Sequence, residues 1–216
     1  MSTLHVFVVS TFLFAMAVVV AIMEIETEGK HGWAQHLPTW YRTEGRVAQL
    51  YIKSTGRPAL TGYHAAITPL PFLIFLLPMV YTSHFSLAGV LMVAAIYFVW
   101  TIVWDFSWFA LNPHYGVAKF RRNRVWWFSQ ERWHFGRVPE SYIKATLTSL
   151  AFATLSGAAS GGAVNGLTWS VEQIGWYLVF TALLVRFGAP AFRKYYWHMR
   201  QQDHRGMAPI FDVDDA

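Results

Sequence analysis

All of the positively charged residues of this chain fall on one side of a series of apolar segments. Five apolar runs are each close to the length that crosses roughly 30 Å of hydrocarbon: Leu4–Met23, His64–Thr82, Phe85–Leu111, Tyr142–Ala159 and Trp169–Phe187. If these runs are helices, all 17 Lys and Arg residues lie in or beside every second connection. This asymmetry is typical of membrane proteins, which keep positive charge on the cytoplasmic side.

The charge asymmetry predicts both a fold class and an orientation. We expect an all-α integral membrane protein with five transmembrane helices and one or two interfacial helices, the N-terminus outside and the C-terminus inside. The chain, 1–216, is expected to form a single multi-pass domain whose cytoplasmic segments are 24–63, 112–141 and 188–216. Hydrophobic residues make up 55% of the chain and charged residues 13%, which agrees with this class. The expected location is a bacterial inner (plasma) membrane.

Charge and cysteine content exclude several kinds of partner and site. The net charge of +5 lies in loops that border helices, where it sets topology and meets anionic lipid. We therefore expect membrane lipids as partners and no nucleic acid. The chain has no Cys, so it forms no disulfide and no thiolate metal site. The first apolar run has no positive residues before it and is expected to stay as a membrane helix rather than be cleaved.

Two short helices are expected in the cytoplasmic segments. In the first segment, Thr43 is a candidate cap for a helix that carries Val47, Leu50 and Tyr51 on one side. In the second segment, the spacing predicts a helix through Val125–His134, capped by Asn123 and closed by Gly136. Its aromatic and basic composition is typical of a helix lying at the membrane interface.

Asp105 is the ionisable residue placed deepest among the apolar runs. It lies six residues, or roughly 9 Å, before the predicted cytoplasmic end of the third helix. A carboxylate at that depth is by default a functional-site candidate. The alternative is that it pairs with an Arg such as Arg186 and only holds helices together. Two nearby polar residues, Asn112 and His114, are expected to support the site.

Two Glu-x-x-His spacings predict a metal site at the cytoplasmic side. Glu28 precedes His31 by three positions, and Glu131 precedes His134 by the same interval, so on a helix each pair would share one face. Carboxylates and imidazoles arranged in this way bind di-iron centres in helical bundles. The predicted ligands are Glu28, His31, His64, Asp105, Glu131 and His134, with Glu24 as a further carboxylate. Oxygen and imidazole ligands without sulfur favour iron, with one or two ions, over manganese or zinc.

Seven of the nine histidines fall on the predicted cytoplasmic side. This distribution resembles that of the membrane-bound desaturases and hydroxylases, which gather histidines on the cytoplasmic side to hold two irons. The resemblance is one of distribution, because no two histidines are three or four positions apart, as in the His boxes of those families. No residue role is taken from it.

Three functions remain open from the sequence. The first is a metal-dependent oxidoreductase, with non-haem iron, that oxidises or hydroxylates a lipid-like apolar substrate at the cytoplasmic headgroup level. The second is a non-catalytic subunit or assembly factor bound to partner membrane subunits, with His64 as a possible ligand of haem or pigment. The third is a transporter with Asp105 on an ion path.

Overall fold

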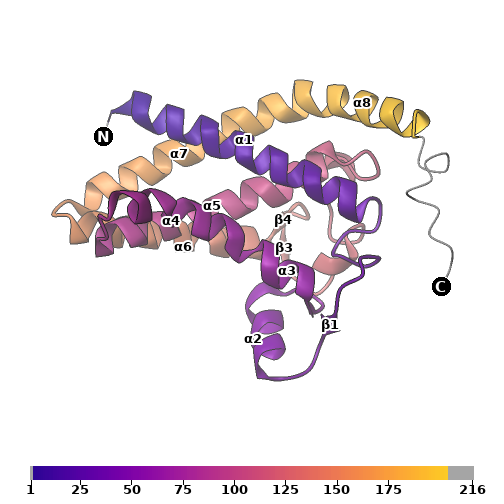
Figure 1. Ribbon diagram of the computed structural model, residues 1–216, viewed down its shortest axis with the longest axis horizontal. Helices are drawn as coiled ribbons and strands as arrows, with labels where there is room; N and C mark the ends of the chain where they lie inside the picture. Colours follow the sequence, from indigo (N-terminus) through magenta and orange to yellow (C-terminus); the bar gives the residue numbers. More distant parts are fainter. Residues whose placement is uncertain (1, 204–216) are drawn as a thin grey trace.

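The computed structural model describes residues 2–203 and consists mostly of helices (Figure 1). In chain order they are α1 (Thr3–Glu28), α2 (Arg46–Thr55), α3 (Gly62–Ile67), α4 (Pro69–Thr82), α5 (Leu87–Leu111), α6 (Glu140–Ala159), α7 (Ala163–Leu183) and α8 (Ala189–Gln201). Two antiparallel pairs of short strands join β1 (Tyr41–Arg42) to β2 (Leu60–Thr61) and β3 (Trp133–His134) to β4 (Val138–Pro139). The last part of the expected cytoplasmic tail, from His204 to Ala216, lies outside the described residues.

Four helical segments are long and apolar enough to cross a membrane: Thr3–Glu28, Gly62–Thr82, Leu87–Leu111 and Ala163–Gln201. Large apolar side chains cover their outer faces, among them Phe12, Leu73 and Leu178, which are 70%, 61% and 68% exposed. Such surfaces are unfavourable in water and are solvated by hydrocarbon. The architecture is that of an all-α, multi-pass membrane protein.

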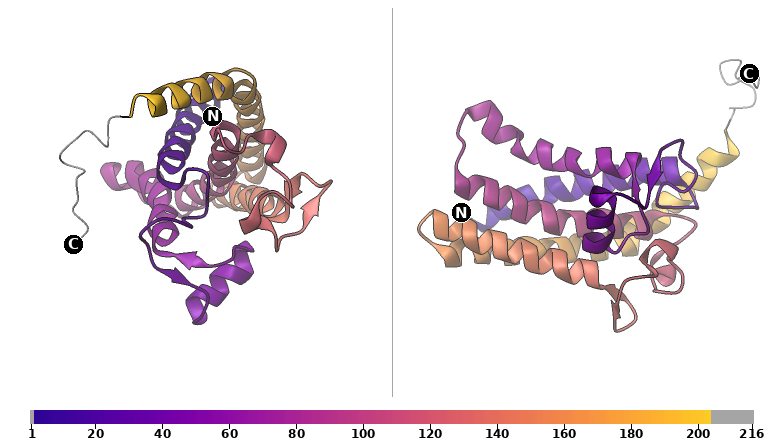
Figure 2. Two further views of the ribbon diagram at one scale, coloured as in Figure 1. Left: turned by 90° about the vertical axis from the view of Figure 1, so that its right-hand side faces the viewer. Right: turned by 90° about the horizontal axis from the view of Figure 1, so that it is seen from below.

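The helices run side by side, and their connections fall at two unlike ends (Figures 1 and 2). One end holds the N-terminus and the short connections 83–86 and 160–162, none of which contains Lys or Arg. The other end holds the connections 29–61 and 112–139, with α2 and both strand pairs. We call this second end, with residues 29–61 and 112–139, the loop-rich end.

The fifth expected span, 142–159, is helical as α6 but is less apolar than the other four. Its hydroxyls bond to the neighbouring helix, as Ser149 Oγ does by donating to the Ala95 carbonyl of α5 at 2.7 Å. On its other side α6 meets α7, where a Cβ added to Gly166 would lie 2.1 Å from the Ala153 carbonyl oxygen. Small residues permit this close approach of two backbones. α6 is therefore held between α5 and α7.

Two helices extend beyond their predicted bounds. α1 continues to Glu28 because the polar residues after Met23 keep their helical hydrogen bonds. α7 begins at Ala163 and continues through a π-helical turn, Leu184–Gly188, into α8. The end of an apolar run marks where the environment changes, and a helix does not have to end there.

The prediction of a helix through Val125–His134 is wrong. This part of the chain forms a 3-10 turn, Trp126–Phe128, followed by the β3–β4 hairpin, whose turn places Phe135 and Gly136 at positive φ. The side chains of Trp127 and Phe128 are buried in the protein core instead of lying along an interfacial face. Tertiary packing of these aromatics has overridden a helical spacing that was weak on its own.

The short helix predicted in the first connection is present as α2. It begins after Gly45, and the proposed Thr43 cap does not form, since the helix has no side-chain cap. Val47 and Leu50 are 72% and 69% exposed on its surface. α2 therefore presents an apolar face outward at the loop-rich end, as an interfacial helix does.

Candidate functional site

The loop-rich end contains a cavity of about 540 Å³ between α1, α3, α5, α6 and the adjoining connections. Its volume falls within the range of about 300–1,000 Å³ that is usual for small-molecule sites. Four buried tryptophans contribute to the wall: Trp33, Trp104, Trp108 and Trp127. The ionisable groups that line it include Glu24, Glu28, Arg57, His64, Asp105 and Tyr142. We call it the acidic cavity.

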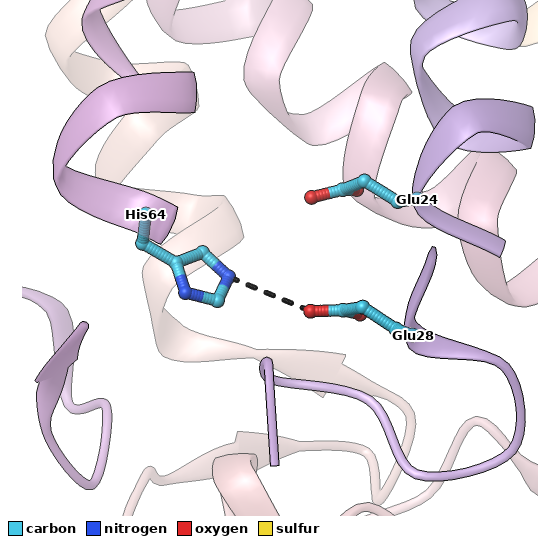
Figure 3. Close-up of side chains that lie close together, drawn as sticks. All are labelled: Glu24, Glu28 and His64. Atoms are coloured by element: carbon cyan, nitrogen blue, oxygen red, sulfur yellow. Dashed lines mark ion pairs between the residues drawn. The ribbon is translucent and has the colours of Figure 1, made fainter. Parts of the chain in front are cut away.

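Glu24, Glu28 and His64 converge on one point of this cavity (Figure 3). The two glutamates lie one helical turn apart near the end of α1, so that both point to the same side. His64, from α3, points back toward them, and its Nε2 lies 3.9 Å from Glu28 Oε1. One ligand atom from each residue can be chosen so that all three lie within 4.8 Å of one another. All three residues are buried.

The imidazole of His64 is held in place by its neighbours. Thr61 caps α3, and its Oγ1 lies 2.7 Å from His64 Nδ1, so that Nε2 faces the glutamates. The ring stacks on Trp33, with 3.8 Å between the ring centroids. Glu28 is fixed in a similar way, since its Oε1 accepts a hydrogen bond from the Ala34 backbone N–H at 2.6 Å. The convergence is therefore built by local contacts on both sides.

Asp105 lies in the wall of the same cavity, and its carboxylate accepts a hydrogen bond from the Tyr142 hydroxyl. Tyr142 comes from the first turn of α6, so this bond joins α5 to α6. The alternative partner considered from the sequence, Arg186, instead lies by the ring of Phe187. Asp105 does not belong to the group of three whose ligand atoms lie within 4.8 Å.

Arg57 is the buried cation of the site. Its Nη1 lies 2.8 Å from Glu131 Oε1, and its guanidinium carbon lies 3.6 Å from the centroid of the Phe128 ring. Glu131 Oε2 also accepts the backbone N–H of Ser141 at 3.1 Å. The charge of Arg57 is therefore matched by Glu131 and does not compensate the glutamates of α1.

The structure brings only some of the predicted metal ligands together. Glu28 and His64 meet, and Asp105 faces the same space. His31 instead packs on His36, with ring centroids 3.7 Å apart. His134 is exposed on the β3–β4 hairpin. The shared face inferred for Glu131 and His134 does not exist, because no helix forms there.

Asn112 and His114 lie at the end of α5, outside the walls of the acidic cavity. Asn112 Nδ2 donates to the Gly29 carbonyl at 2.9 Å, and its Oδ1 accepts the His114 backbone N–H at 2.9 Å. The His114 ring lies edge-on to Trp197, with centroids 5.3 Å apart. Partial burial, together with the nearby charges of Lys30 and Lys119, lowers the pKa of His114 below its usual value. These residues join the end of α5 to the connection after α1.

Sequence reasoning did not single out three residues that the structure pairs or partly buries: Arg57, Tyr142 and Glu172. Nothing in the spacing of Arg57 and Tyr142 shows that they meet Glu131 and Asp105. Glu172, midway along α7, could have been found as a carboxylate within an apolar run. Its Oε1 is buried without a hydrogen-bond partner among the described residues.

The donors present fit a divalent metal ion. Three carboxyl groups line the cavity, while its two cations, Arg57 and Lys144, are paired with Glu131 and Glu140. A buried carboxylate is costly unless a cation, a proton or hydrogen bonds stabilise it, and a cation bound between Glu24 and Glu28 would be one such stabilising partner. Two atoms that bind one ion at about 2.1 Å in tetrahedral geometry are about 3.4 Å apart. The three ligand atoms, which lie within 4.8 Å of one another, would therefore need to approach by up to about 1.4 Å.

No protein-family model matches the chain, and neither a curated protein nor a solved structure matches it. The functional argument therefore rests on the geometry of the site.

Proposed function

We propose that the protein is a membrane-bound, metal-dependent oxidoreductase that acts on a lipid-like apolar substrate in the acidic cavity. The observation that carries the proposal is the convergence of the buried residues Glu24, Glu28 and His64 in a cavity with aromatic walls. Two carboxylates and one imidazole suit iron, with manganese or zinc as weaker alternatives. When bound, iron supplies the activation of dioxygen for oxidation or hydroxylation, with electrons from an external donor.

Some residues of the acidic cavity would bind the metal, and others would orient these ligands. Glu24, Glu28 and His64 would hold the metal, and Thr61 would set the direction of the imidazole by its contact with Nδ1. Across the cavity, the Tyr142 hydroxyl would hold a proton that it shares with Asp105. The hydrophobic wall would exclude water and favour an apolar substrate over a polar one.

The membrane topology is part of the proposal. We propose five crossings, with α6 as the fifth, and the loop-rich end in the cytoplasm of a bacterial cell. The acidic cavity would then lie at the cytoplasmic headgroup level, where a lipid-like substrate can reach it sideways from the bilayer. A reporter inserted at Gly162 should behave as external and one fused after Ala216 as cytoplasmic. Reversed labelling at both positions would contradict the topology.

Metal analysis of the detergent-purified protein tests the function. We expect iron in the wild-type protein and a large loss in Glu24→Gln, Glu28→Gln and His64→Ala. His31 and His134 were predicted as ligands from the sequence, but the structure does not place them with Glu24, Glu28 and His64. The variants His31→Ala and His134→Ala should therefore keep their metal. His84→Ala, at the opposite end, is the control for His removal.

Two results would contradict the proposal. Equal metal content in all of these variants would show that the ion binds elsewhere. A wild-type protein that stays free of metal after anaerobic reconstitution with ferrous iron would leave the non-catalytic subunit as the better hypothesis.

A further inference from the structure

A second cavity, of about 510 Å³, lies between α5, α6 and α7. The side chains that line it from the helices are mostly apolar, among them Val103, Phe106, Ile174 and Leu178. Its α5 residues run from Val99 to Phe106, which spans about 10 Å along the helix axis at 1.5 Å per residue. We call it the apolar cavity. It has the length and surface that a segment of an acyl chain would fill.

Two arginines stand where this cavity meets the loop-rich end. Arg121 lies in the connection between α5 and α6, and Arg137 belongs to the β3–β4 turn. Both residues line the cavity and are exposed. Neither forms an ion pair with any part of the chain that the structure describes. Exposed guanidinium groups remain solvated, and they bind phosphate oxygens by two parallel hydrogen bonds.

We propose that the apolar cavity binds an anionic phospholipid, with an acyl chain between α5, α6 and α7 and the phosphate at Arg121 and Arg137. The cavity and the two charges are arranged as an amphiphile requires, apolar along the helices and positive at their loop-rich end. Basic pockets between membrane helices are a known setting for anionic headgroups. A neutral lipid would fill the cavity but would leave both arginines without a partner.

The proposed lipid site does not depend on the metal site. Ile102 and Tyr142 line both cavities and form a common wall between them. None of the three converging residues Glu24, Glu28 and His64 lines the apolar cavity. Loss of lipid is therefore expected without loss of metal, and the two proposals can fail separately.

Phosphatidylglycerol in nanodiscs or mixed micelles, followed by native mass spectrometry, tests the site. We expect Arg121→Ala/Arg137→Ala to weaken phosphatidylglycerol binding about 30-fold, from roughly the attraction of two surface cations for anionic lipid. Arg122→Ala/Arg124→Ala removes the same charge from exposed neighbours that do not line the cavity, and it should weaken binding no more than about threefold. Phosphatidylcholine should bind the wild type as weakly as phosphatidylglycerol binds the first variant.

A second pair of variants tests the acyl chain independently of charge. Ile174→Trp fills the cavity from α7, whereas Val179→Trp adds the same ring to an exposed position on that helix. Only Ile174→Trp should lose phosphatidylglycerol, and both should keep the metal content of the wild type. Equal losses in the two arginine double variants, or full binding by Ile174→Trp, would overturn the proposal.

Discussion

The two cavities are nearly equal in volume, at about 540 and 510 Å³, and share part of a wall, yet their charges are placed differently. In the acidic cavity, carboxylates and an imidazole lie buried inside, next to aromatic rings. In the apolar cavity, the charged groups are Arg121 and Arg137, both exposed at the loop-rich end. The difference lies in whether charge has been removed from solvent.

This difference determines what each cavity can bind. A carboxylate inside a low-dielectric space has lost its hydration, so it must gain a cation, a proton or a set of hydrogen bonds. An exposed arginine at the opening of a cavity keeps its hydration, so it loses little free energy when no anion is bound to it. This contrast supports our proposals of a metal ion for the acidic cavity and an amphiphile for the apolar cavity.

The largest loss of stability is expected from breaking the buried ion pair between Arg57, which lines the acidic cavity, and Glu131. Arg57→Met leaves the Glu131 carboxylate buried without its cation, which typically costs about 3–5 kcal/mol. Chemical unfolding in detergent should show this loss of stability. The double variant Arg57→Met/Glu131→Gln should recover part of it, because it no longer leaves a buried charge.

The matched control is an exposed pair on the same protein. Arg200 Nη2 lies 2.7 Å from Glu26 Oε2, and both side chains are partly exposed. Arg200→Ala should cost at most about 1 kcal/mol. If Arg57→Met were no more destabilising than this control, Arg57 and Glu131 would not form a buried ion pair as described.

An intermediate effect is expected where α6, a wall of both cavities, meets α7. A Cβ at Gly166 would collide with the Ala153 carbonyl, so Gly166→Ala should cost about 3 kcal/mol and reduce binding of both metal and lipid. Gly175→Ala on the same helix meets no atom within 4 Å and should stabilise the protein by up to about 1 kcal/mol. Thermal unfolding and the two binding assays check the pair. A Gly166→Ala protein of wild-type stability would show that α6 is not packed as described.

The smallest effect is expected at the common wall. Tyr142→Phe removes the hydroxyl that donates to Asp105 and should cost about 1.5 kcal/mol. Asp105→Asn keeps an acceptor for that hydroxyl, so it should change stability less. Both variants should lower oxidation activity or metal content and leave phosphatidylglycerol bound. If Asp105→Asn were the more destabilising of the two, a cation rather than Tyr142 would be the partner of Asp105.

The helical framework was predictable because lipid imposes a strong constraint on sequence. A chain that crosses hydrocarbon must satisfy its backbone within each helix, so long apolar runs such as 4–23 and 85–111 marked helices α1 and α5. The bounds were less predictable, as α1 shows by continuing to Glu28. At the loop-rich end the sequence was misleading, because the burial of Trp127 and Phe128 depends on contacts with distant segments.

The candidate site could be predicted only in part, for the same reason. Asp105 was selected because ionisable residues in apolar runs are rare, and His64 because it is one of the histidines on the predicted cytoplasmic side. The Glu-x-x-His spacing selected His31 and His134 on the assumption of helix, yet α1 ends at Glu28 and 133–139 forms a hairpin. Glu24 and Glu28 are one turn apart on a real helix, whereas their meeting with His64 depends on the fold of the whole 29–61 connection.

The most direct test of the central claim is an anomalous difference map, measured at the iron edge, from crystals of iron-loaded protein. A peak at bonding distance, about 2.1 Å, from carboxylate oxygens of Glu24 and Glu28 and from Nε2 of His64 is the result we predict. No peak is expected in the apolar cavity. An iron peak at His31 or His134, or none between the two glutamates and His64 in fully loaded protein, would contradict the account.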